Sequence, residues 1–178
     1  IPNNSHFDTT RANIEYMGSK AVDCLNTEVF DDDKEKFKGN MDVNKLHACI
    51  EEHGHEKIPF IMLTLTNNAG GGQPVSMQNI RQVKSIAEKY SLPLVFDVCR
   101  FAENSYFIHL YETGYENKTL LEIAQEISEE YIFNALKTIL KKNKPTKPIY
   151  IRPFVYTSDL GIAPRLHNIE TDFFIYCI

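Results

Sequence analysis

The chain has 178 residues, about the length of one domain, of which 43% are hydrophobic and 24% charged. This composition excludes a wholly disordered chain, and no run approaches the roughly 18 apolar residues of a membrane helix. The formal net charge of −5 argues against nucleic-acid binding over a broad surface. We therefore expect a globular protein without a nucleic-acid partner and without a membrane segment.

The first residue is Ile1, and no basic segment followed by an apolar one opens the chain, so we predict no secretory signal. Because the chain does not begin with methionine, we expect it to be a piece of a longer protein. Four cysteines are present, and none forms a C-x-x-C pair: Cys24, Cys49, Cys99 and Cys177. This usage favours reduced thiols and a cytoplasmic location.

The first elements that the sequence predicts are a loop and a short helix. Residues 31–38 (DDDKEKFK) carry mixed charges, which indicates a solvated loop. Asp42 is a suitable N-cap, and the apolar residues after it recur at helical spacing. We predict a short amphipathic helix that reaches about His53 and ends at Gly54.

A strand–helix–strand unit follows. Residues 58–66 (IPFIMLTLT) form an apolar run without helical periodicity, which predicts a buried strand. Residues 67–74 predict a loop, and Ser76 can cap a helix to about residue 90. Its predicted core face is Ile80, Val83, Ile86, Ala87 and Tyr90. Residues 94–97 predict a second buried strand, parallel to the first and joined to it by a right-handed crossover.

The later part of the chain predicts one long helix. Its apolar stripe runs over some twenty residues: Leu120, Ala124, Ile127, Tyr131, Ala135 and Ile139. Pro145 prevents further continuation. The short apolar runs after Pro148 predict no definite element.

Polar residues follow both predicted strands at their carboxyl ends. Asn68 comes after the first strand, and Asp97 ends the second. Ligands of open α/β sheets collect outside the carboxyl ends of parallel strands. We therefore expect Asn68 and Asp97 at the same sheet edge, within reach of one ligand.

Each candidate residue also has a structural interpretation. Asp97 and Arg100 could hold a protonated ring nitrogen and a ring oxygen, or they could form a local ion pair that closes a loop. Phe7 could cover a ligand or belong to the core. The turn at 53–56 (HGHE) lacks a distant partner at metal spacing, so we predict no metal site. The glycines of 70–72 match neither the dinucleotide nor the P-loop pattern.

Four blocks in order resemble the tryptophanase and tyrosine phenol-lyase family, the β-eliminating lyases that use pyridoxal phosphate (PLP). The blocks are residues 6–11 (HFDTTR), 37–40 (FKGN), 66–77 (TNNAGGGQPVSM) and 97–108 (DVCRFAENSYFI). The resemblance covers about residues 1–127. It implies an α/β chain that is part of the large PLP-binding domain of the aminotransferase-like type I fold, with a mostly parallel sheet and flanking helices.

The resemblance also implies the roles of four cofactor-binding residues. Phe7 matches the aromatic residue that stacks on the pyridine ring, and Asn68 matches the asparagine near the ring oxygen and the substrate carboxylate. Asp97 matches the aspartate that pairs with the pyridinium nitrogen, and Arg100 the arginine beside the ring oxygen. A buried carboxylate at Asp97 would keep the ring nitrogen protonated, so that the ring can act as an electron sink.

The implied reaction is carbon–carbon cleavage by β-elimination on an aromatic amino acid. Asp8 bears on the substrate, because tryptophanases tend to have Phe-Asp-Thr-Thr-Arg here and tyrosine phenol-lyases Phe-Thr-Thr-Thr-Arg. We expect L-tryptophan as substrate, cleaved to indole, pyruvate and ammonia, with tyrosine phenol-lyase activity as the alternative. The family further implies potassium and a homo-oligomer, a tetramer, for the full-length protein.

The lysine that carries the cofactor is the main departure from the family pattern. Where Ser-x-Lys-Lys-Asp is expected, residues 138–143 read TILKKN. Lys142 aligns best with the catalytic lysine, and a solvated basic helix end is the alternative. We predict a partial PLP-binding large domain at 1–127 and a diverged or truncated tail at 128–178, helical at first. The fragment is expected to be inactive alone, or to be a non-catalytic remnant of such a lyase.

Overall fold

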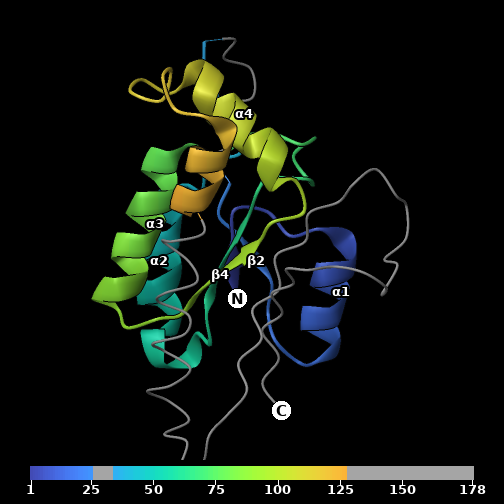
Figure 1. Cartoon of the computed structure of the whole chain (residues 1–178). Coiled ribbons are helices and arrows are strands. Elements are labelled where there is room, and N and C mark those ends of the chain that lie inside the picture. Colours follow the sequence, from blue (N-terminus) through green and yellow to red (C-terminus); the bar gives the residue numbers. More distant parts are fainter. Residues whose placement is uncertain (26–33, 128–178) are drawn as a thin grey trace, which may run out of the picture. The chain divides into compact units, whose positions relative to one another are not determined.

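The computed structural model describes residues 1–25 and 34–127, all within the first of the chain's two compact units, Ile1–Ala135 (Figure 1). Short strands and longer helices alternate along this unit. In chain order they are β1 (Pro2–Asn3), α1 (Asp8–Tyr16), β2 (Val22–Asp23), α2 (Val43–His53), the 3-10 helix η2 (His55–Lys57), β3 (Ile61–Thr64), α3 (Met77–Lys89), β4 (Leu94–Asp97) and α4 (Phe101–Tyr111). A further helix begins at Leu120 and is described to Ile127.

The described part is an α/β unit whose strands pair in parallel. β1 pairs with β2, and β3 pairs with β4. The packing of β1 against β3 brings the two pairs together. The predicted α/β class and the parallel strands are therefore confirmed. None of the helices in residues 1–25 and 34–127 has both the length and the apolar character needed to cross a membrane.

The helix predicted after Asp42 is confirmed at both ends. The Asp42 carboxylate accepts hydrogen bonds from the backbone N–H groups of Asn44 and Lys45 at 2.9 and 3.2 Å, as an N-cap does. α2 ends at His53, and Gly54 follows with φ of 80°, a backbone conformation that favours glycine. α2 is thus terminated by the residues that local sequence rules assign to its ends.

The predicted strand–helix–strand unit is also confirmed, with a shorter first strand. β3 and β4 pair in parallel over four residues, from Ile61 opposite Leu94 to Thr64 opposite Asp97. The predicted 58–66 strand is shorter in the structure, where only residues 61–64 pair with β4. The crossover helix α3 is capped by Ser76, whose hydroxyl accepts from the Asn79 N–H at 3.1 Å.

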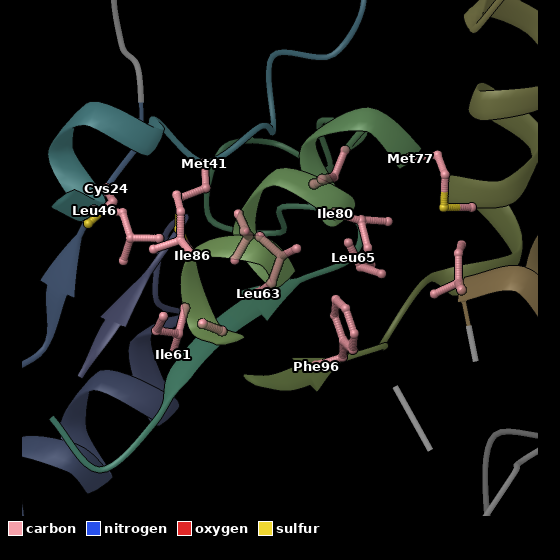
Figure 2. Packing of buried hydrophobic residues seen from close by; sticks show 14 of the residues in the cluster. Cys24, Met41, Leu46, Ile61, Leu63, Leu65, Met77, Ile80, Ile86 and Phe96 are labelled. Atoms are coloured by element: carbon pink, nitrogen blue, oxygen red, sulfur yellow. The ribbon is translucent and has the colours of Figure 1, made fainter. Parts of the chain in front are cut away.

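The core lies between the strands and the helices α2 and α3 (Figure 2). Ile61, Leu63 and Leu65 of the β3 segment are fully buried, and Phe96 of β4 is 7% exposed. The predicted face of α3 is buried except for Tyr90, which is the C-cap and is only partly buried. Packing of these apolar side chains stabilises the unit that presents the strand ends.

The helix that begins at Leu120 buries part of the predicted face: Ile127 is buried and Ala124 half-buried, as expected, but Leu120 is not. Ile123 and Ile127 are buried at helical spacing, whereas Leu120 is 43% exposed. Arg81 of α3 and Lys118 pair with the carboxylate of Glu126, which lies on this helix. The placement of Leu120 in the core is therefore wrong. The rest of the predicted helix lies outside the described residues.

Three buried asparagines tie elements together by pairing with main-chain groups. The Asn4 amide pairs with both the N–H and the C=O of Thr64 in β3, at 2.8 and 3.0 Å. In the same way, the Asn79 amide pairs with the N–H and the C=O of Met41, and the Asn104 amide pairs with those of Val75. Each side-chain amide thus substitutes for a neighbouring peptide group and joins segments where no strand is available.

Candidate functional site

The carboxyl ends of β3 and β4 lie side by side. Thr64 is opposite Asp97, and the N–H of Leu65, the residue directly after β3, donates to the Asp97 carbonyl at 2.8 Å. The Arg100 N–H in turn donates to the Leu65 carbonyl at 2.9 Å. The chain beyond β3 and the chain beyond β4 therefore start from the same sheet edge, as expected from the sequence.

The side chains of Asp97 and Arg100 do not pair with each other. No hydrogen bond or salt bridge joins either side chain to another group in residues 1–25 and 34–127. The local ion pair that the three-residue spacing offered as an alternative is therefore wrong for these residues. A partly exposed carboxylate remains available at the end of β4.

The loop after β3 is closed on itself and presents Asn68. Asn67 and Gln73 form an isolated bridge, with N–H···O distances of 2.8 and 3.1 Å. The Gly72 N–H donates to the Asn67 carbonyl at 2.9 Å, and the Asn67 side chain accepts from the Gly70 N–H at 3.0 Å. Asn68 follows Asn67 in this closed loop and is partly exposed.

Phe7 is exposed near the same edge. It follows β1 and is the N-cap residue of α1, with an extended backbone and 41% of the residue accessible. The Asn4–Thr64 pairing holds the end of β1 against the end of β3. The interpretation of Phe7 as a core residue is therefore wrong, and its ring is accessible. Asp8 begins α1 and is also exposed.

A buried histidine immediately precedes Phe7. His6 is 3% exposed, and its Nδ1 lies 2.7 Å from a carboxylate oxygen of Asp23, which also accepts from the His6 backbone N–H at 3.0 Å. Arg11 donates to the other oxygen of Asp23 at 2.5 Å. Burial lowers the pKa of His6. This cluster anchors the backbone next to Phe7. Sequence reasoning missed it because its members are far apart in the chain.

Polar groups at this edge fit a planar, polar ligand. The Thr66 hydroxyl oxygen and the Asn67 amide nitrogen are buried without a hydrogen-bond partner in the described residues. Such orphaned groups are rare inside proteins, and a bound ligand or an ordered water is the usual explanation. Together with the Asp97 carboxylate and the exposed ring of Phe7, they fit a group such as PLP, which has an aromatic face, a ring nitrogen and ring oxygens.

Two sequence-based expectations are not tested by this arrangement. Lys142 lies outside the described residues. In the described ranges no group of three or more potential ligands gathers that could hold a metal ion. Cys24, Cys49 and Cys99 are free thiols, and Cys177 lies outside the described residues.

Comparison with known proteins defines the class of this chain. The profile of the family described as "Beta-eliminating lyase" matches residues 1–143. A probable β-eliminating lyase of Trichomonas vaginalis is 52% identical over 128 residues, which are 71% of this chain and 28% of that protein. A tryptophanase of Salinibacter ruber is 49% identical over 71% of this chain and 27% of its own length. A tyrosine phenol-lyase of Lacrimispora saccharolytica is 44% identical over the same shares.

The chain belongs to the β-eliminating lyase family, because the family profile covers most of its length. This confirms the resemblance carried by the four sequence blocks. The chain spans less than a third of the length of each of these curated relatives.

Proposed function

We propose that this chain is the part of a PLP-dependent β-eliminating lyase that holds the pyridine ring of the cofactor. The observation that carries the proposal is the Asp97 carboxylate, which ends β4 beside the loop of Asn68 and has no partner in the described residues. The carboxylate is partly exposed at the strand end, and a protonated ring nitrogen is a suitable partner for it, because a hydrogen bond between charged groups is stronger than one between neutral groups.

In this proposal each residue has one task. Asp97 accepts a hydrogen bond from the ring nitrogen and keeps it protonated. Arg100 donates to the ring oxygen, and Asn68 donates to the same oxygen or to the substrate carboxylate. Phe7 covers one face of the ring and excludes water from it. When bound, PLP supplies an electron sink for the bonding pair released at the substrate Cα.

The proposed substrate is an aromatic amino acid, L-tryptophan, cleaved to indole, pyruvate and ammonia. Asp8 supports tryptophan over tyrosine, because it stands where tyrosine phenol-lyases tend to have threonine. Relatives named tryptophanase and tyrosine phenol-lyase both match the chain, at 49% and 44% identity. Asp8 is thus proposed as the residue that bears on the substrate, and Lys142 as the lysine that carries the cofactor.

The remaining properties follow from the family and are proposed with the function. They are membership in the large PLP-binding domain of the aminotransferase-like type I fold, the division into a partial large domain at 1–127 and a tail at 128–178, a potassium requirement, a homo-oligomeric full-length protein and a cytoplasmic location.

The test of the cofactor site is titration with PLP, followed by absorbance. Asp97→Asn removes a hydrogen bond to a charged group, which contributes about 1.5–3 kcal/mol, so affinity should fall roughly 10- to 100-fold. In Asp97→Asn, the absorbance of bound PLP should also change at a lower pH than in the wild type, because the ring nitrogen loses its proton more easily. Glu103→Gln, at an exposed carboxylate in the first turn of α4, is the matched control. Equal affinity in wild type and Asp97→Asn would contradict the proposal.

Two further measurements address the lysine and the substrate. Borohydride fixes PLP on the lysine that holds it, and peptide mass spectrometry should then find the label on Lys142. In the assembled protein, indole should be released from L-tryptophan faster than phenol is released from L-tyrosine. Asp8→Thr should bring these two rates closer together. A label on another lysine would refute the assignment of Lys142 but not the proposed cofactor site.

A further inference from the structure

Gly72 lies close to the side chain of Arg100, at the distance of one missing methyl group. A Cβ atom built on Gly72 would be 3.1 Å from Nη1 of Arg100 and 3.8 Å from the Thr66 hydroxyl oxygen. The first distance is shorter than an ordinary van der Waals contact, so an alanine would require the guanidinium to move by a few tenths of an ångström. The absence of a side chain at position 72 therefore lets the guanidinium approach the loop at this point without displacement.

This contact connects the two strand ends. Gly72 belongs to the loop after β3. Its N–H donates to the Asn67 carbonyl at 2.9 Å, and this hydrogen bond helps to close the loop. Arg100 belongs to the turn after β4, where its N–H binds the Leu65 carbonyl. The loop that carries Asn68 and the residue that carries the guanidinium thus touch at position 72.

We propose that Gly72 is a positioning residue, which sets the place of the Arg100 guanidinium relative to Asn68. The inference rests on the proposed function, in which Arg100 and Asn68 bind oxygens of the same ligand. A guanidinium on a flexible, exposed side chain would lose much of its effect without a surface to lie on, because orientation is lost with each free torsion. The glycine loop provides that surface.

The same loop contains a matched control. Gly71 has φ of 85° and Gly72 has φ of 75°, so an alanine at either position suffers the same type of backbone strain. No atom lies within 4 Å of a Cβ built on Gly71. Gly71→Ala therefore reproduces the strain of Gly72→Ala without the contact to Arg100. Because the guanidinium is the far end of a flexible side chain, both variants should lose similar stability.

The experiment compares wild type, Gly71→Ala and Gly72→Ala in the 178-residue chain. The ¹⁵N heteronuclear NOE of the Arg100 Nε–H group reports side-chain order, and Arg100→Lys assigns its resonance. We expect an ordered Nε–H in the wild type and in Gly71→Ala, and a clearly lower NOE in Gly72→Ala. Thermal unfolding should show similar melting temperatures for the two alanine variants.

Titration with PLP gives the second readout. Gly72→Ala should bind at least tenfold more weakly than Gly71→Ala, and in an Arg100→Ala background the two substitutions should have equal effects. A low NOE in all three proteins, or equal PLP affinities of the two alanine variants, would overturn the role of Gly72. Absence of PLP binding to the wild type would instead refute the proposed function, while the NOE comparison would still decide whether Gly72 orders Arg100.

Discussion

Asn4→Ala tests how β1 is held against β3, and with it how Phe7 reaches the edge where Asp97 and Asn68 lie. The Asn4 amide makes three hydrogen bonds, all to buried main-chain groups. It accepts from the Thr64 N–H at 2.8 Å and donates to the Thr64 carbonyl at 3.0 Å and the Gly39 carbonyl at 2.9 Å. Asn4 itself is 0% exposed. Alanine removes all three bonds at once.

The magnitude follows from what is left behind. Leu65 pairs with β4, so Thr64 directs its N–H and C=O to the opposite side, toward Asn4. Without the amide, three buried polar groups lose a partner, and each such loss costs about 1–3 kcal/mol. We expect a total loss of roughly 3–5 kcal/mol, since some of these groups can recover a water. For a chain of this size that corresponds to a fall in Tm on the order of 10 °C.

Urea denaturation followed by circular dichroism measures this loss as a shift of the midpoint. Asn13→Ala, at an exposed position of α1, is the control and should change stability by less than about 0.5 kcal/mol. A loss below about 1 kcal/mol for Asn4→Ala would refute the reasoning, because it would mean that the main chain of Thr64 finds other partners without cost.

Elements defined by local patterns were predictable from the sequence. Asp42 and Gly54 specify the ends of α2 by capping chemistry alone. Ser76 and the apolar spacing that follows specify α3, and the break before Leu94 specifies β4. In each case residues within one or two helical turns determine the outcome, which is why single-sequence reasoning succeeds there.

Other elements depend on contacts that the sequence does not display. β1 and β2 have two residues each, too few for any periodicity. α4 buries Asn104 and Ser105 together with Ile108, while Tyr106 and Tyr111 are exposed, so its buried face is not the apolar stripe that a sequence pattern predicts. Asn104 is buried because it pairs with Val75, a tertiary contact that no helical pattern reveals.

In the candidate site, too, some features follow from local sequence rules and others depend on tertiary contacts. The strand-end rule was sufficient to place Asp97 beside the loop after β3, because parallel pairing determines which ends meet. The spacing of Asp97 and Arg100 suggested an ion pair, but the guanidinium lies near Gly72, which is distant in sequence. The His6–Asp23 pair was missed for the same reason. Close approaches of this type depend on the folded loop.

Two further predictions concern α3 and its neighbours. Glu112→Ala should destabilise the chain by about 1–2 kcal/mol in urea denaturation. The reason is that the Glu112 carboxylate accepts from the Met77 and Gln78 N–H groups in the first turn of α3, at 2.7 and 2.8 Å. Glu103→Ala, at an exposed carboxylate, is the control and should leave the stability unchanged. Tyr115→Phe tests a pH dependence. Burial, followed by the hydrogen bond to Glu126, raises the pKa of Tyr115 to about 12. A pKa raised on folding means that the folded state holds this proton more tightly. The contribution of Tyr115 to stability is therefore complete below about pH 10 and is lost as the pH rises toward 12, by at most about 2 kcal/mol. At neutral pH Tyr115→Phe should be the less stable protein, by about 1 kcal/mol for the lost hydrogen bond. Between pH 10 and 12 the wild type should lose more stability than Tyr115→Phe, so that the two curves converge. Curves that stay parallel over this range would show that the Tyr115 proton is not held by the fold.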